Sequence, residues 1–191
     1  RRGGFDGRGV QVLRKGADLA RAFDAPAVIE DLVPIERELS ILVARNPQGD
    51  VAAYPPVGMS FHPTANLVEF LEAPAELPPE VVRHATNLAC ELAETLQLVG
   101  LLAVELFLDT NGNLLINEIA PRPHNSGHHT IEANVTSQFE QHLRAILGLP
   151  LGDVRTLSPA VMVNLLGSEA GTGAPRYEGL EDVLAMPGVA L

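Results

Sequence analysis

The feature that most constrains this sequence is an Asn111-Gly112 pair between two apolar runs, because Asn-Gly is the strongest short signal for a tight β-hairpin. If a two-residue turn closes the hairpin, residue 110 faces residue 113, and the register places Glu105 directly opposite Glu118. Facing side chains have Cβ atoms about 5 Å apart, where two like charges destabilise a sheet unless something neutralises them. The sequence therefore predicts either an exposed acidic pair or a site for a divalent cation.

A dense polar segment follows the second of these carboxylates. Between residues 117 and 129 it combines a carboxylate, an arginine, an amide, a hydroxyl and three histidines, and two prolines keep it out of regular structure. Magnesium prefers carboxylate oxygens and leaves coordination positions free for substrate phosphates. On its own, the pair Glu105 and Glu118 favours an exposed acidic face. Together with this segment it favours a metal and nucleotide site.

Composition and charge exclude several classes of protein. A chain of 191 residues with 46% hydrophobic content can bury a sizeable core, as one domain or a little more. Its 24 acidic against 13 basic side chains give a net charge of -11, which argues against a nucleic-acid or anionic-membrane surface. No apolar run approaches the roughly 20 residues that span a bilayer, and no signal-peptide pattern opens the chain, so we expect a cytoplasmic protein.

Both ends of the sequence are expected to be cut from a longer protein. The chain begins without methionine, directly in a glycine-rich run, and stops in an apolar run. The expected organisation is one partial domain over residues 1–155 and the start of a small β-rich domain over 156–191. The single cysteine, Cys90, lies in a helical pattern, which favours a buried structural thiol over a nucleophile.

The order of expected elements indicates an α+β fold with a largely antiparallel sheet. Apolar periodicity predicts helices at 17–23, 79–98 and 137–147. The helix at 79–98 should pack on the Glu105/Glu118 hairpin. Turn chemistry at 46–50 predicts a second hairpin, and residues 55–63 are expected to be irregular. The expected strands are 10–13, 27–30, 39–44, 51–54, 67–71 and 160–165.

Four further places in the sequence are candidate sites with ordinary alternatives. The glycine-rich loop at 3–9 suits a cover over phosphates, with Arg8 adding positive charge, or a flexible connection, and it lacks the Walker ending. Residues 30–33 leave a strand before a proline, so their free backbone groups could meet a planar base or form a plain strand exit. One carboxylate of the stretch 36–38 could bind ribose hydroxyls, or the whole stretch could be a solvated face, and His62 could be a site residue or a loop histidine.

Taken together, the segments 3–9, 36–40, 117–128 and 136–142 resemble motifs of the ATP-grasp ligases, and within them of the 5-(carboxyamino)imidazole ribonucleotide synthases. The resemblance runs through nearly the whole chain, and the segment 117–128 is the most specific part of it. It implies an ATP-grasp fold that uses ATP with magnesium, or manganese in its place.

The resemblance also implies site residues. Glu105 and Glu118 would bind the metal, and Arg8, Arg122 and His124 would be catalytic. The nucleotide would be bound by the loop residues Gly4, Phe5, Asp6, Gly7, Arg8, Gly9 and Val10, by Glu30, Asp31, Leu32 and Val33, and by Glu38, His62, Asn117 and Glu118. The ribonucleotide substrate would be bound by Asp6, Arg122, Asn125 and Ser126.

The reaction implied by the resemblance is carboxylation of 5-aminoimidazole ribonucleotide with bicarbonate and ATP. The full-length protein would be a homodimer, and the present chain alone would be inactive because phosphate-binding lysines would precede it. Two departures from the family pattern stand out: Phe5 replaces a tyrosine, and Ala120 occupies a position where many ATP-grasp enzymes carry an asparagine.

Two other functions remain open at this stage. One is an ATP-grasp carboxylase or amine ligase with a different acceptor, similar to biotin carboxylase or to formate-dependent glycinamide ribonucleotide transformylase. The other is an ATP-binding module without chemistry.

Overall fold

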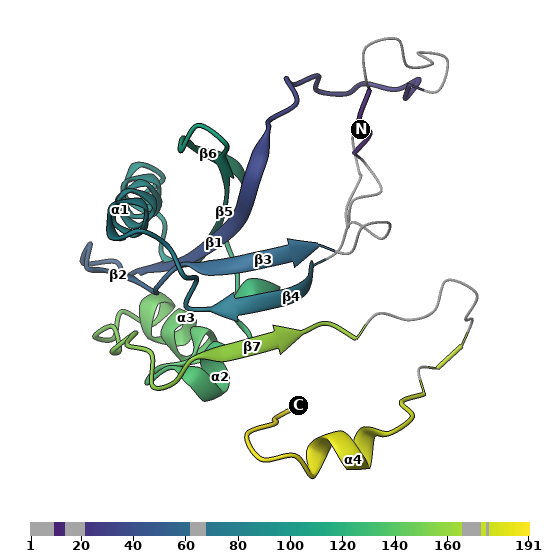
Figure 1. Ribbon diagram of the computed structural model, residues 1–191. Coiled ribbons are helices and arrows are strands. Elements are labelled where there is room, and N and C mark those ends of the chain that lie inside the picture. The colour runs from purple at the N-terminus through teal and green to yellow at the C-terminus, as the bar shows by residue number, and fades with distance from the viewer. Residues whose placement is uncertain (1–9, 14–21, 62–67, 166–172, 175) are drawn as a thin grey trace.

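The fold is built on one antiparallel sheet with helices on both faces (Figure 1). The computed structural model describes residues 10–13, 22–61, 68–165, 173–174 and 176–191. Its strands lie in the order β6-β5-β1-β3-β4-β7, and β2 pairs with the end of β1. The strands are β1 (Ile35–Arg45), β2 (Val51–Ala53), β3 (Val57–Phe61), β4 (Val68–Ala73), β5 (Gly100–Asp109), β6 (Leu114–Ala120) and β7 (Ala160–Val163). Every pairing among these strands is antiparallel, which confirms the predicted α+β class.

The helices of the described chain differ greatly in length. They are α1 (Pro79–Thr95), the 3₁₀ turn η2 (Asn125–Gly127), α2 (Thr130–Ala133), α3 (Gln138–Ile146) and α4 (Leu180–Leu184). The helices α1 and α3 lie where apolar periodicity predicted them. Helix α1 begins at the predicted residue and ends three residues early, and α3 is one residue shorter at each end. Among the described residues, no helix is long and apolar enough to cross a membrane.

Helix α1 covers one face of β1 and β5. Three small residues at four-residue spacing, Ala85, Ala89 and Ala93, are fully buried there and let the helix backbone approach the sheet closely. They pack in one cluster with residues that alternate along the two strands, Leu39, Ile41, Val43, Leu102, Val104 and Leu106. The predicted packing of the helix on the hairpin is confirmed for the β5 strand, but the helix packs most extensively on β1. Cys90 is partly buried beside the same cluster.

The opposite face of β1 and β5 carries the other half of the alternation. Leu42, Ala44, Leu101 and Ala103 are buried there with Tyr54. Helices α2 and α3 lie on this side of the sheet, away from α1 (Figure 1). Glu105 belongs to this alternation as well, so its carboxylate lies on the face opposite to α1.

In the hairpin between β5 and β6, Glu105 faces Glu118 as predicted, but the turn and the register that bring them together differ from the prediction. The predicted two-residue turn is wrong: Asp109 N donates to Asn113 O, which leaves a three-residue loop with Gly112 at φ +82°. This loop shifts the register by one residue, so that Leu106 faces Ile116. A bulge then shifts the register back, and Glu105 faces Glu118 with Asn117 as the extra residue.

The carboxylate of Asp109 accounts for the wider loop. It accepts hydrogen bonds from the backbone N–H groups of Asn111 and Asn113 and from the side-chain amide of Asn113. These hydrogen bonds, of which those from Asn113 have the largest effect, lower the pKa of Asp109 below its ordinary value. An aspartate at the start of the loop thus replaces the Asn-Gly turn as the organising group.

Several predictions on the remaining elements are wrong. Residues 10–13 and 27–30 form no strand, and Val28 and Ile29 are 83% and 93% exposed, since no described strand pairs with them. Residues 57–61, expected to be irregular, form β3 between β1 and β4, where pairing on both sides outweighs the glycine and serine in the strand. The helix predicted at 17–23 falls largely outside the described residues, and its last two residues are not helical.

Candidate active site

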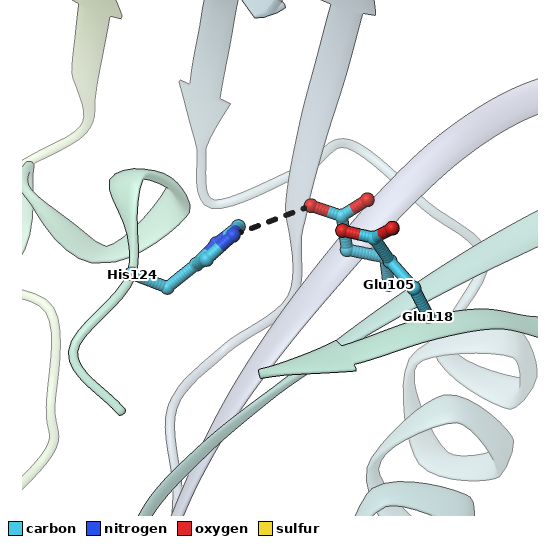
Figure 2. A group of neighbouring side chains, drawn as sticks. All are labelled: Glu105, Glu118 and His124. Atoms are coloured by element: carbon cyan, nitrogen blue, oxygen red, sulfur yellow. Dashed lines mark ion pairs between the residues drawn. The ribbon is translucent and has the colours of Figure 1, made fainter. Parts of the chain in front are cut away.

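Strand β5 and the edge strand β6 bring the acidic pair together on the face of the sheet opposite to α1. Glu105 of β5 is 8% exposed, whereas Glu118 of β6 is exposed. Their carboxylates lie side by side, and the ring of His124 points at them from the following loop (Figure 2). One atom of each of the three side chains lies within 4.8 Å of the other two. Such a cluster has the size and the oxygen ligands to hold a divalent cation.

The environment of Glu105 opposes its negative charge. Burial, and then the charges of Glu118 and Glu38, raise the pKa of Glu105 to about 7. Glu38, from β1, also has a raised pKa because it is partly buried. Three carboxylates in this arrangement repel one another, so a bound cation would stabilise the ionised form.

His124 lies beside the acidic pair, and its surroundings disfavour the positively charged form of its ring. Its Nε2 atom is 3.8 Å from Oε1 of Glu105. Burial first, and then the neighbouring charges of Arg122 and His128, lower the pKa of His124 below its ordinary value. Both effects favour the neutral form of the ring, in which one nitrogen donates a hydrogen bond and the other accepts one.

Gln138, the first residue of α3, fixes the loop that carries His124. Its side-chain oxygen accepts from His124 N at 2.9 Å, and its amide donates to His124 O at 2.8 Å and lies 3.0 Å from Nδ1 of His128. The residue is fully buried. Because the buried amide of Gln138 has all its hydrogen-bond partners, it holds the backbone of His124 rigidly, and we call this the Gln138 clamp.

Two residues predicted to bind the ribonucleotide are engaged within the protein. Asn125 and Asn164 exchange hydrogen bonds through their side-chain amides, at 2.8 and 3.1 Å, and Asn164 also donates to Val68 O. Ser126 is 1% exposed, and its hydroxyl contacts Ser40 at 2.8 Å and His124 at 3.0 Å. The structure therefore leaves Ser126 no surface for a direct substrate contact.

The other predicted nucleotide residues are only partly brought together. Glu38 borders an open pocket of about 430 Å³, which is also lined by Arg37 and Glu72, an ion pair. Residues 30–32 and Val10 are exposed coil, and Val33 is half-buried. Asn117 is the extra residue of the β6 bulge, next to Glu118. Arg122 is exposed and donates to Pro123 O. The loop residues 4–9 and His62 lie outside the described residues.

Sequence reasoning missed three residues that build the site: Ser40, Gln138 and Asn164. Gln138 lies within the segment 136–142 that resembles a family motif, so a signal existed, but no site role was assigned to it. Ser40 likewise ends the motif-like segment 36–40 without having been given a role, whereas Asn164 carries no local signal, because its partner Asn125 lies far away in the sequence.

Comparison with known proteins fits this geometry. The model of the ATP-grasp domain matches residues 1–139, and the chain therefore belongs to the ATP-grasp family. The acidic pair on β5 and β6 thus lies in an ATP-grasp domain.

Within that family, the chain is similar to one kind of protein in particular. It is 44% identical over 172 residues to the N5-carboxyaminoimidazole ribonucleotide synthase of Bacillus subtilis, covering 88% of this chain and 45% of the relative. The crystal structure of the N5-carboxyaminoimidazole ribonucleotide synthetase from Thermotoga maritima matches with a TM-score of 0.83 at 47% identity, covering 93% of this chain and 47% of that one.

A more distant structure contains ligands. The Aspergillus clavatus N5-carboxyaminoimidazole synthase in complex with ADP and 5-aminoimidazole ribonucleotide matches with a TM-score of 0.67 at 32% identity, covering 72% of this chain and 37% of that one. The present chain spans about half the length of the curated relatives it matches, 45% in the Bacillus subtilis case.

Proposed function

We propose that the full-length protein carboxylates 5-aminoimidazole ribonucleotide with bicarbonate, converting ATP to ADP and phosphate, in purine biosynthesis. The observation that carries the proposal is the facing pair Glu105 and Glu118 beside His124, in an ATP-grasp chain similar to N5-carboxyaminoimidazole ribonucleotide synthases. The ligands named in the Aspergillus clavatus structure, ADP and 5-aminoimidazole ribonucleotide, match this assignment.

The proposed reaction proceeds in two steps. An oxygen of bicarbonate attacks the γ-phosphorus of ATP, ADP leaves, and carboxyphosphate forms. The exocyclic amine of the aminoimidazole then attacks the carboxyl carbon, loses a proton, and phosphate leaves. Phosphoryl transfer needs mainly positioning and neutralisation of charge, so side chains with fixed geometry carry most of the catalysis.

The residues of this chain fit those needs. The two carboxylates of Glu105 and Glu118 offer the hard oxygen ligands that magnesium or manganese requires, and the ion would neutralise phosphate charge. Arg122 and His124 follow on the same loop and would face bicarbonate and the acceptor amine, and Arg122 would also neutralise phosphoryl charge. Glu38, beside its pocket, would bind the ribose.

The remaining assignments are retained as part of the proposal. Residues 4–10, residues 30–33, His62 and Asn117 would complete the nucleotide site, with Arg8 over the phosphates and with Asp6, Arg122 and Asn125 near the ribonucleotide. Residues 1–155 would form the ATP-grasp part and 156–191 the start of the next domain. The full-length enzyme would be a cytoplasmic homodimer.

The test uses the full-length protein and measures release of ADP and phosphate. The proposal expects release that depends on both bicarbonate and 5-aminoimidazole ribonucleotide, and its loss in Glu118→Gln. Glu91→Gln, which changes an exposed carboxylate on α1, is the matched control and should retain activity. Turnover with a different acceptor, or ATP binding without turnover, would replace this function with another ligase or with a non-catalytic binding module.

A further inference from the structure

A short chain of buried hydroxyl groups connects the sheet to the ring of His124. Ser40 on β1 faces Glu105 on β5 in the register, and both Ser40 and Ser126 are 1% exposed. The Ser40 hydroxyl lies 2.8 Å from that of Ser126, which lies 3.0 Å from Nδ1 of His124. The ring of His124, which lies beside the acidic pair, is thus connected through Ser126 to Ser40 on β1, the strand that pairs with β5.

The backbone decides which ring nitrogen carries the proton. The N–H of Ser126 caps the turn η2 by donating to Nδ1 of His124 at 3.4 Å. A backbone N–H can only donate, so Nδ1 accepts and has no proton. Neutral imidazole carries one N–H, and the hydrogen bond made by one nitrogen sets the state of the other. The proton is therefore on Nε2, the atom that faces Glu105.

We propose that Ser126, held by Ser40, is a positioning residue that keeps His124 as an Nε2–H donor aimed at the reacting oxygens beside the acidic pair. In this state Nε2 has no free lone pair, so Glu105 and Glu118 would hold a cation without His124, although one atom of each of the three side chains lies within 4.8 Å of the others. The Gln138 clamp keeps the His124 backbone in place, and Ser126 sets the rotation of the ring. The catalytic part of this proposal rests on the proposed function.

The first experiment reads the proton position without any turnover. Nitrogen NMR of the full-length protein labelled on histidine is recorded where the ring is neutral, and the signals of His124 are identified by their loss in His124→Ala. The proposal expects an unprotonated Nδ1 and a protonated Nε2. A proton on Nδ1 would overturn it, whether or not the protein proves to be the proposed carboxylase.

The second experiment is a double-mutant cycle on kcat. Ser126→Ala should lower kcat roughly tenfold, because the His124 ring would no longer be held in the orientation that the reaction needs. The KM for ATP should stay within about twofold of the wild-type value. In the His124→Ala background the same change should have no further effect beyond about twofold. An equal loss in both backgrounds would mean that Ser126 does not act through His124, and would overturn the proposal.

A matched control separates positioning from lost stability. Asn46 is also buried, and its side chain hydrogen-bonds Asp50 at the far end of β1. Asn46→Ala removes buried hydrogen bonds but leaves the site alone, so kcat should stay within about twofold of the wild type. A loss of kcat in Asn46→Ala as large as that in Ser126→Ala would show that destabilisation alone explains the effect and would contradict the positioning role.

Discussion

The raised pKa of Glu105 makes a specific prediction about stability when no metal is present. The folded protein holds this carboxyl with a pKa of about 7, against an ordinary value of 4.5, because of burial and the charges of Glu118 and Glu38. Each pKa unit corresponds to about 1.4 kcal/mol, so the difference amounts to about 3 kcal/mol. Between pH 4.5 and 7 the folded state binds more protons than the unfolded state, and stability falls as the pH rises through this range.

Glu105→Gln removes this dependence because an amide does not titrate. We expect its free energy of unfolding, relative to the wild type, to increase by about 3 kcal/mol from pH 4.5 to pH 8. The assay is urea unfolding of the full-length protein in the presence of a chelator, compared at each pH. Glu91→Gln on the exposed side of α1 is the control and should follow the wild type. A difference between Glu105→Gln and wild type that stays constant across this range would refute the reasoning.

Three further predictions concern the same region. Lowering the pH from 8 to 6 should weaken the binding of free Mn²⁺ about tenfold, since a carboxylate with a pKa of about 7 must lose its proton to bind, and a titration followed by electron paramagnetic resonance checks this. Gln138→Ala should lower the free energy of unfolding by about 3 kcal/mol, because both backbone groups of His124 lose their partner, as urea unfolding would show. Gly127→Ala should cost about 1–3 kcal/mol in the same assay, because its Cβ would overlap the side chains of Gln138 and Leu42. Unchanged values in any of the three would contradict the corresponding geometry.

The sequence predicted well the parts of the fold that depend on local patterns. The periodicity of α1 and the turn residues 46–50 give a helix and a hairpin where they were expected. The facing of Glu105 and Glu118 was also predicted, but two one-residue errors cancelled. The loop is one residue longer than assumed, and the bulge at Asn117 restores the register. Neither depends on hydrophobic pattern, so periodicity alone could not reveal them.

The parts that could not be predicted depend on partners distant in the sequence. Val28 and Ile29 have an apolar pattern typical of a strand, yet no described strand lies beside them. The resemblance made Ser126 a candidate substrate contact, but it could not show that the Ser126 hydroxyl is 1% exposed and contacts Ser40, which is 86 positions away in the sequence. Exposure and hydrogen-bond partners of a loop residue follow from tertiary packing, which a single sequence does not contain.

The central claim is that Glu105 and Glu118 together hold the divalent cation, and direct measurement of Mn²⁺ binding to the full-length protein tests it. Binding followed by electron paramagnetic resonance at pH 8 should be strong in the wild type, lost in Glu105→Gln and in Glu118→Gln, and retained in His124→Ala. Retention of wild-type affinity in either glutamine variant would contradict the account of this site.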